Sequence, residues 1–147
     1  MTALPASGTG KIPHQGGNRS SRLSLYFYST WTGGFGLRDL WVASRPTLDG
    51  KFVAPKNLAP LYGNTDDHLP WISDDERTIL FSTTRNGYLA PLYIAERAAK
   101  ADAFSLRVPV GGLSTSTSRE DRAALANNGQ TLHYVSDRPG GAGDKDI

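Results

Sequence analysis

The sequence predicts an all-β protein built from about three copies of one unit of roughly 53 residues. Three similar segments recur at nearly equal spacing, which is the first sign of a repeat. Short runs of β-forming residues alternate with turns rich in Gly, Asn and Asp, which accept tight-turn dihedral angles. Several of these runs are apolar on both faces, which indicates sheets that are covered on both sides.

The repeat is clearest in three segments, which start at Leu25, Ile79 and Leu132 and are therefore 54 and 53 residues apart. The match extends in both directions beyond these segments. Upstream, residues 67–75 align with residues 120–128. Downstream, residues 39–43 align with residues 91–95, and Asp146-Ile147 begins the same pattern a third time.

Each unit is expected to form four short strands in succession. Pro109 restricts the fourth strand to a sheet edge, because proline has no N–H to donate to a neighbouring strand. Residues 96–102 (ERAAKAD) have helical propensity but are so few that they predict one helical turn or a loop. The expected strands are residues 69–73 and 122–126 (first), 78–83 and 131–136 (second), 40–43 (third) and 106–110 (fourth).

Four short strands in about 50 residues, apolar on both faces, are typical of a β-propeller blade. The sequence therefore predicts a β-propeller fragment of about three four-stranded blades, an open arc that is incomplete at both ends. The first unit lacks an inner strand and the third stops at Ile147, whereas closed propellers have at least four blades. We expect the arc to belong to a longer protein or to self-associate through exposed blade edges. The expected parts are a flexible tail (1–22) and blades at about 23–60, 61–113 and 114–147.

Residues 23–147 resemble the WD40-like PD40 repeat of TolB-like propellers. The resemblance is carried by the Ser-Asp-Asp-Glu-Arg-Thr turn at 73–78, the Val-Ser-Asp-Arg-Pro-Gly-Gly run at 135–141, and Asp146-Ile147. Two positions depart from the family pattern: Glu76 stands where Gly is usual, and 126–129 (Ala-Asn-Asn-Gly) replace Ser-Pro-Asp-Gly.

The resemblance implies a periplasmic or extracytoplasmic binding scaffold that contacts a protein or a cell-envelope polymer. The alternative is the propeller domain of a peptidase or other hydrolase whose catalytic domain is not in this chain. A downstream Gly-x-Ser-x-Gly domain would separate the two hypotheses.

Composition excludes several other classes. The chain has no cysteine, which excludes disulfides, Cys-ligated zinc and thiol catalysis. A net charge of +2 is too small to favour a nucleic-acid partner. No run reaches the roughly 20 apolar residues of a membrane span, and the N-terminus has no signal-peptide core.

No catalytic, cofactor or metal site is expected, so the chain is predicted not to be an enzyme. Residues 33–36 (Gly-Gly-Phe-Gly) predict a hairpin loop, because a dinucleotide site would need a third glycine and a following helix. The three histidines, His14, His68 and His133, lack metal-ligand spacing. No serine lies in a Gly-x-Ser-x-Gly motif.

Two groups of residues are the candidate sites. Acidic residues and His68 at the start of an inner propeller strand would lie on the rim of the central channel, where ligands usually bind; the alternative is that they stabilise the loop before the strand. The second group is structural: Asp137 is expected to accept amides of the Gly-rich turn, and Arg138 to form an ion pair with a neighbouring blade, in preference to a calcium site. The rim residues are Asp66, Asp67, His68, Trp71, Glu120 and Asp121, and the repeat-motif residues are Ser136, Asp137, Arg138, Gly140 and Gly141.

Overall fold

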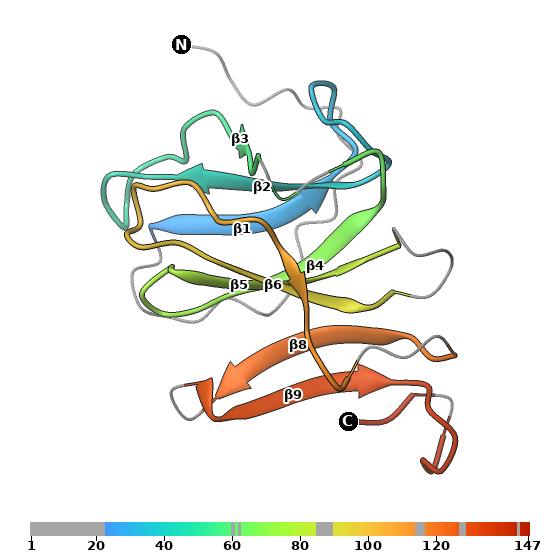
Figure 1. Cartoon of the computed structure of the whole chain (residues 1–147). Helices are drawn as coiled ribbons and strands as arrows, with labels where there is room; N and C mark the ends of the chain where they lie inside the picture. Colours follow the sequence, from blue (N-terminus) through green and yellow to red (C-terminus); the bar gives the residue numbers. More distant parts are fainter. Residues whose placement is uncertain are drawn as a thin grey trace.

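The computed structural model describes residues 23–59, 61, 63–84, 90–113, 117–126, 129–143 and 145–147. The predicted tail, 1–22, lies outside these residues. In the described part the chain is all-β, with nine strands in three antiparallel sheets, no helix and no closed sheet. Figure 1 shows the three sheets stacked in chain order, from β1–β3 at the top to β8 and β9 at the bottom.

The strands within each sheet follow the chain without crossovers. The second strands, predicted at 78–83 and 131–136, are confirmed. Four strands occur only in the second sheet; three and two occur in the others, counting described residues. The first sheet holds β1 (Ser24–Ser29), β2 (Asp39–Ser44) and β3 (Lys56–Asn57); the second β4 (Asp67–Ile72), β5 (Thr78–Thr83), β6 (Leu92–Glu96) and β7 (Val108–Pro109); the third β8 (Glu120–Ala126) and β9 (Thr131–Ser136).

The segment after β6 forms a loop, which was one of the two alternatives predicted for 96–102. Its bends and turn are held by bonds from Asp102 N to Ala99 O and from Ala99 N to Asp102 Oδ2, both 2.9 Å. The Asp102 carboxylate thus accepts a backbone amide within the turn. The outer strand has two residues instead of five, and Pro109 lies on the sheet edge as predicted.

The first strands of the second and third sheets, β4 and β8, contain the same irregularity. In β4 the register with β5 shifts between His68 and Trp71, and in β8 the register with β9 shifts between Asp121 and Ala124. Leu69 (φ 53°) and Arg122 (φ 50°) lie inside these bulges in the left-handed region. Because the two are 53 residues apart, the sequence period is also a period of backbone geometry.

The following turn repeats as well. Glu76 has φ 57°, and Gly129, 53 residues later, has φ 86°. Glycine adopts this conformation without a steric cost, whereas a side chain does so at a cost of about 1 kcal/mol. The departure at Glu76 therefore falls at a position that favours glycine.

The core lies between the sheets. On one side of the second sheet, Ile79 and Phe81 pack against Tyr26 and Leu40 of the first sheet. On the other side, Leu80 packs in a second cluster that includes residues of β8 and β9. From Ile79 to Thr83, β5 is buried throughout, which explains why its sequence is apolar on both faces.

The Gly-rich loop between β1 and β2 is held by Asp39. Its Oδ2 accepts the amides of Phe35 (3.0 Å) and Gly36 (3.3 Å), so the hairpin-loop interpretation is correct. In the third sheet, Asp146 Oδ2 accepts the amide of Gly143 (3.2 Å). A Cβ at Gly34 would overlap Asp39, and one at Gly141 would overlap Asp146, so the two loops are built alike.

A methyl group at Gly36 is expected to destabilise the protein. A Cβ there would overlap the carbonyl oxygen of Thr65, which is backbone and cannot move aside like a flexible side chain. We expect Gly36→Ala to lower the free energy of unfolding by about 1–3 kcal/mol in urea titrations. The matched control is Gly111→Ala, since a Cβ at Gly111 meets nothing within 4 Å. Equal stability of the two variants would contradict this packing.

Candidate functional site

Polar residues converge where β4 and β8, the strands predicted to be inner strands, begin. His68 of β4 and Asp121 of β8 occupy equivalent positions in the repeat, 53 residues apart. The structure brings them together: His68 Nε2 lies 3.8 Å from Asp121 Oδ1, and both residues are buried. The ring of Tyr28 meets the His68 ring edge-on, with centroids 6.2 Å apart.

Three basic side chains pair with the carboxylates of this region. Arg38 binds Asp66 through two nitrogens, a bidentate geometry that suits guanidinium and carboxylate. Lys145 Nζ lies 3.0 Å from Asp121 Oδ2, and Arg138 Nη2 lies 3.1 Å from Glu120 Oε1. We call these residues the inner-strand cluster: Arg38, Asp66, His68, Glu120, Asp121, Arg138 and Lys145.

The accessible charge of the inner-strand cluster is cationic. The side chains of Arg38, Lys145 and Arg138 are 35%, 43% and 31% exposed. Their carboxylate partners are only 12% (Asp66), 8% (Asp121) and 0% (Glu120) exposed. A ligand approaching this region therefore meets ammonium and guanidinium groups, with the acids beneath them.

The predicted rim residues do not all lie in this cluster. His68 lies near Asp66 and Asp121, and Glu120 pairs with Arg138. Asp67, which is wholly buried, and Trp71 are not part of the cluster. Trp71 is buried in the core between the second and third sheets, so its indole is not an exposed anchor. Arg38 and Lys145 were not predicted; no sequence signal marks them, because each pairs with an acid 28 or 24 residues away.

The repeat-motif residues have different partners from those expected. Asp137 Oδ1 accepts the amide of Arg119 (2.7 Å), whereas the amide of the Gly-rich turn goes to Asp146. Asp146 therefore has the role that was predicted for Asp137. Asp146 pairs with Ser136, and this pairing places its carboxylate beside the Gly-rich loop.

Arg138 pairs within its own sheet, so the prediction of an ion pair with a neighbouring blade is wrong. Its guanidinium reaches Glu120 of β8, lies 5.6 Å from the ring centroid of Tyr134 and also donates to the carbonyl of Leu113. The amide of Arg138 donates to Ser136 Oγ (3.3 Å). Gly140 has φ 105°, which suits the tight turn that follows.

The described residues contain no group of three His, Asp or Glu side chains placed to hold a metal ion. None of the segments described there forms a helix of the length and apolarity that a membrane span requires. Asp144 lies outside the described residues.

Burial lowers the pKa of His68 below its usual value, and the nearby charge of Arg38 adds to this effect. Asp66 and Asp121 act in the opposite direction but do not compensate. The imidazole is therefore neutral in the folded protein at pH 7. In the unfolded chain it takes up a proton near its ordinary pKa of about 6.5.

This difference predicts a loss of stability in mild acid. As the pH falls below about 6.5, the unfolded state binds a proton that the folded state resists, so unfolding becomes easier until the lowered folded pKa is passed. Urea unfolding from pH 8 to pH 5 should show a steeper loss for the wild type than for His68→Gln. His133→Gln, at an exposed strand position, should follow the wild type. Identical profiles for all three proteins would refute the role of His68.

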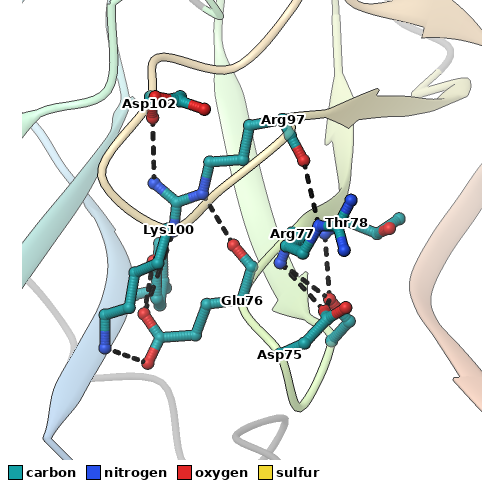
Figure 2. A network of polar contacts seen from close by, with 9 residues as sticks. Asp75, Glu76, Arg77, Thr78, Arg97, Lys100 and Asp102 are labelled. Atoms are coloured by element: carbon teal, nitrogen blue, oxygen red, sulfur yellow. Dashed lines mark hydrogen bonds and ion pairs between the residues drawn. The ribbon is translucent and has the colours of Figure 1, made fainter.

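A second polar cluster lies at the opposite ends of β4 and β5, around the buried carboxylate of Glu76 (Figure 2). Glu76 accepts bonds from Lys100 Nζ (2.7 Å) and Tyr26 Oη (3.0 Å), and Arg97 Nη2 is 3.9 Å away. Arg97 Nε also donates to the Glu76 carbonyl (2.7 Å). The pKa of Tyr26 is raised, mainly because the phenol is buried. All these groups have internal partners, so the cluster joins the first two sheets and is structural.

The two clusters differ in the number of partly exposed cations that they carry. The inner-strand cluster has three, whereas the Glu76 cluster, in the described residues, has Lys100 (51% exposed) beside the buried Arg97. The inner-strand cluster is therefore the candidate site. Searches of protein-family models and of curated proteins found no match to this chain, so the PD40 resemblance stays a prediction and the functional argument rests on geometry.

Proposed function

We propose that the chain is an arc of a TolB-like β-propeller and acts as a non-catalytic binding module at the cell envelope, outside the cytoplasm. Three observations support the propeller: the 53-residue period in bulges and turns, the covered faces of β5, and the stacking of the sheets in chain order (Figure 1). In this arrangement β4 and β8 are inner strands, and the inner-strand cluster lies at the channel.

The observation that carries the binding role is the layered charge of the inner-strand cluster. The buried carboxylates hold Arg38, Arg138 and Lys145 in place, and these cations keep part of their surface in solvent. Such fixed cations favour a partner with carboxylates, because a positioned guanidinium loses little freedom on binding. We propose a carboxylate-bearing ligand, from an acidic protein segment or an envelope polymer.

The test compares two probes, a fluorescent Glu-rich octapeptide and soluble peptidoglycan fragments, in direct binding titrations. Lys145→Gln should weaken binding about fivefold, because the carboxylate of the ligand loses its charge interaction with a partly exposed ammonium group. The control is Lys51→Gln, which removes an exposed lysine far from the inner strands in sequence. Preference for one probe would identify the source of the carboxylate. Binding of neither probe, or equal losses in both variants, would contradict the proposal.

A further inference from the structure

The loop between β1 and β2, residues 30–38, exposes two large apolar side chains next to the inner-strand cluster. Phe35 is 64% exposed and Leu37 is 72% exposed. The residue after Leu37 is Arg38, a member of the cluster whose side chain is 35% exposed. Large apolar side chains that are exposed near one another mark interaction surfaces more often than those that occur singly.

The backbone of this loop is fixed against the first and second sheets. Asp39 Oδ2 accepts the amide of Gly36 (3.3 Å), and Gly36 packs so closely on the carbonyl oxygen of Thr65 that a Cβ would overlap it. The carbonyl of Arg38 accepts the amide of Asp67, the first residue of β4 (2.8 Å). Because the loop is already held in place, little conformational freedom is lost when a partner binds to it.

A loop of the same construction in the third sheet lacks the aromatic side chain. It is held through the amide of Gly143 (3.2 Å), and Ala142 stands there at the position 107 residues after Phe35. The cation is common to both loops, since Lys145 lies 107 residues after Arg38. The backbone of the loop therefore forms without a large side chain at this position, and folding of the loop does not account for the aromatic ring.

The guanidinium beside the loop is also fixed. Arg38 binds both carboxylate oxygens of Asp66, and its guanidinium lies 5.5 Å from the ring centroid of Tyr28. Asp66 is only 12% exposed, so the positive charge of the pair is more accessible than the negative charge. The loop and the guanidinium thus offer neighbouring contacts for an apolar side chain and for a carboxylate.

We propose that the partner of the inner-strand cluster is a polypeptide segment in which a large apolar side chain stands among acidic residues. Phe35 and Leu37 contact the apolar side chain, and Arg38 attracts a neighbouring carboxylate. This inference rests on the proposed carboxylate-binding function and selects between its two sources. A polypeptide carries carboxylates and large apolar side chains on one chain, whereas peptidoglycan carries carboxylates among hydroxyl groups and small side chains. Burial of apolar surface then adds to the attraction between charges.

The test uses the full chain and two fluorescent octapeptides, EEEEFEEE and EEEEAEEE, which are capped at both ends and have the same charge. In anisotropy titrations the Phe peptide should bind about tenfold more tightly than the Ala peptide, because its ring leaves water on binding. Leu37→Ser should remove most of this advantage and leave the affinity for the Ala peptide unchanged. Phe35→Ala should act in the same way, and Ala142 shows that such a loop forms with alanine.

The matched control is Leu48→Ser. Leu48 is 54% exposed and follows the opposite end of β2, so its loss should leave the advantage of the Phe peptide intact. An advantage that persists in both Leu37→Ser and Phe35→Ala, or that falls equally in Leu48→Ser, would overturn the contact with this loop.

The remaining outcomes separate this inference from the proposed function. If the wild type binds both peptides equally, and Lys145→Gln weakens both, the apolar contact is refuted while carboxylate binding stands. Tighter binding of soluble peptidoglycan fragments than of the Phe peptide would likewise refute a polypeptide partner alone. If neither the peptides nor the fragments bind, the proposed function fails, and this inference fails with it.

Discussion

Replacing Glu76 with glutamine is expected to lower the free energy of unfolding by about 3 kcal/mol, as measured by urea unfolding at pH 7. The carboxylate is buried and compensates the charge of Arg97, whose side chain is only 8% exposed. Glutamine keeps the shape of the side chain but removes its charge, so the guanidinium stays buried without its counter-charge. Removing one partner of a buried ion pair lowers the free energy of unfolding by more than the intact pair contributes to it, because the other charge stays buried without compensation.

A glycine at the same position separates charge from backbone conformation. Glu76→Gly relieves the left-handed φ of 57°, which by itself would stabilise the protein by about 1 kcal/mol. We expect the variant to be destabilised nonetheless, because the bonds to Tyr26 and Lys100 are lost. A Glu76→Gly protein more stable than the wild type would show that the carboxylate contributes little.

The exposed carboxylate next in the chain supplies the matched control. Asp75 accepts bonds from Ser73 Oγ (2.6 Å) and Arg77 N (3.0 Å) inside the same turn. These bonds lower its pKa, but solvent screens the side chain. Asp75→Asn should therefore cost about 0.5 kcal/mol. A cost equal to that of Glu76→Gln would mean that position in the turn, not burial, sets the effect.

The sequence could predict strands where the repeat supplied two aligned copies. Both second strands were predicted at their observed bounds, since the apolar run and its flanking turns occur in each copy. The first strands were predicted to start two residues late in each copy, because Leu69 and Arg122 lie in bulges. A bulge changes the direction of the backbone, but no particular residue type marks its position in the sequence.

The sequence predicted the acids of the candidate site, His68 and one of its three cations. Four of the six predicted rim residues belong to the inner-strand cluster, and Arg138 was predicted to form an ion pair, although with a different partner. The other two cations come from elsewhere: Arg38 precedes β2, and Lys145 follows the Gly-rich turn of the third sheet. Glu76 shows the same limit, because its partners Tyr26 and Lys100 are 50 and 24 residues away. Pairings across sheets depend on tertiary packing, which neither propensity nor periodicity encodes.

Truncation of Phe81 is expected to have the largest effect of any single core change. Its side chain is fully buried, stacks with Tyr93 at 6.2 Å between ring centroids, and joins the cluster between the first two sheets. Phe81→Ala should lower the free energy of unfolding by about 3–5 kcal/mol, because it leaves a cavity between two sheets that cannot both relax around it. Urea titrations followed by tryptophan fluorescence would measure this loss.

The repeat provides a matched position in the third sheet. Tyr134 is the equivalent of Phe81, 53 residues later, but it is only half-buried. Tyr134→Ala should therefore cost about 1–2 kcal/mol, since less apolar area returns to water on unfolding. Equal losses for Phe81→Ala and Tyr134→Ala would mean that the third sheet is as tightly packed as the second.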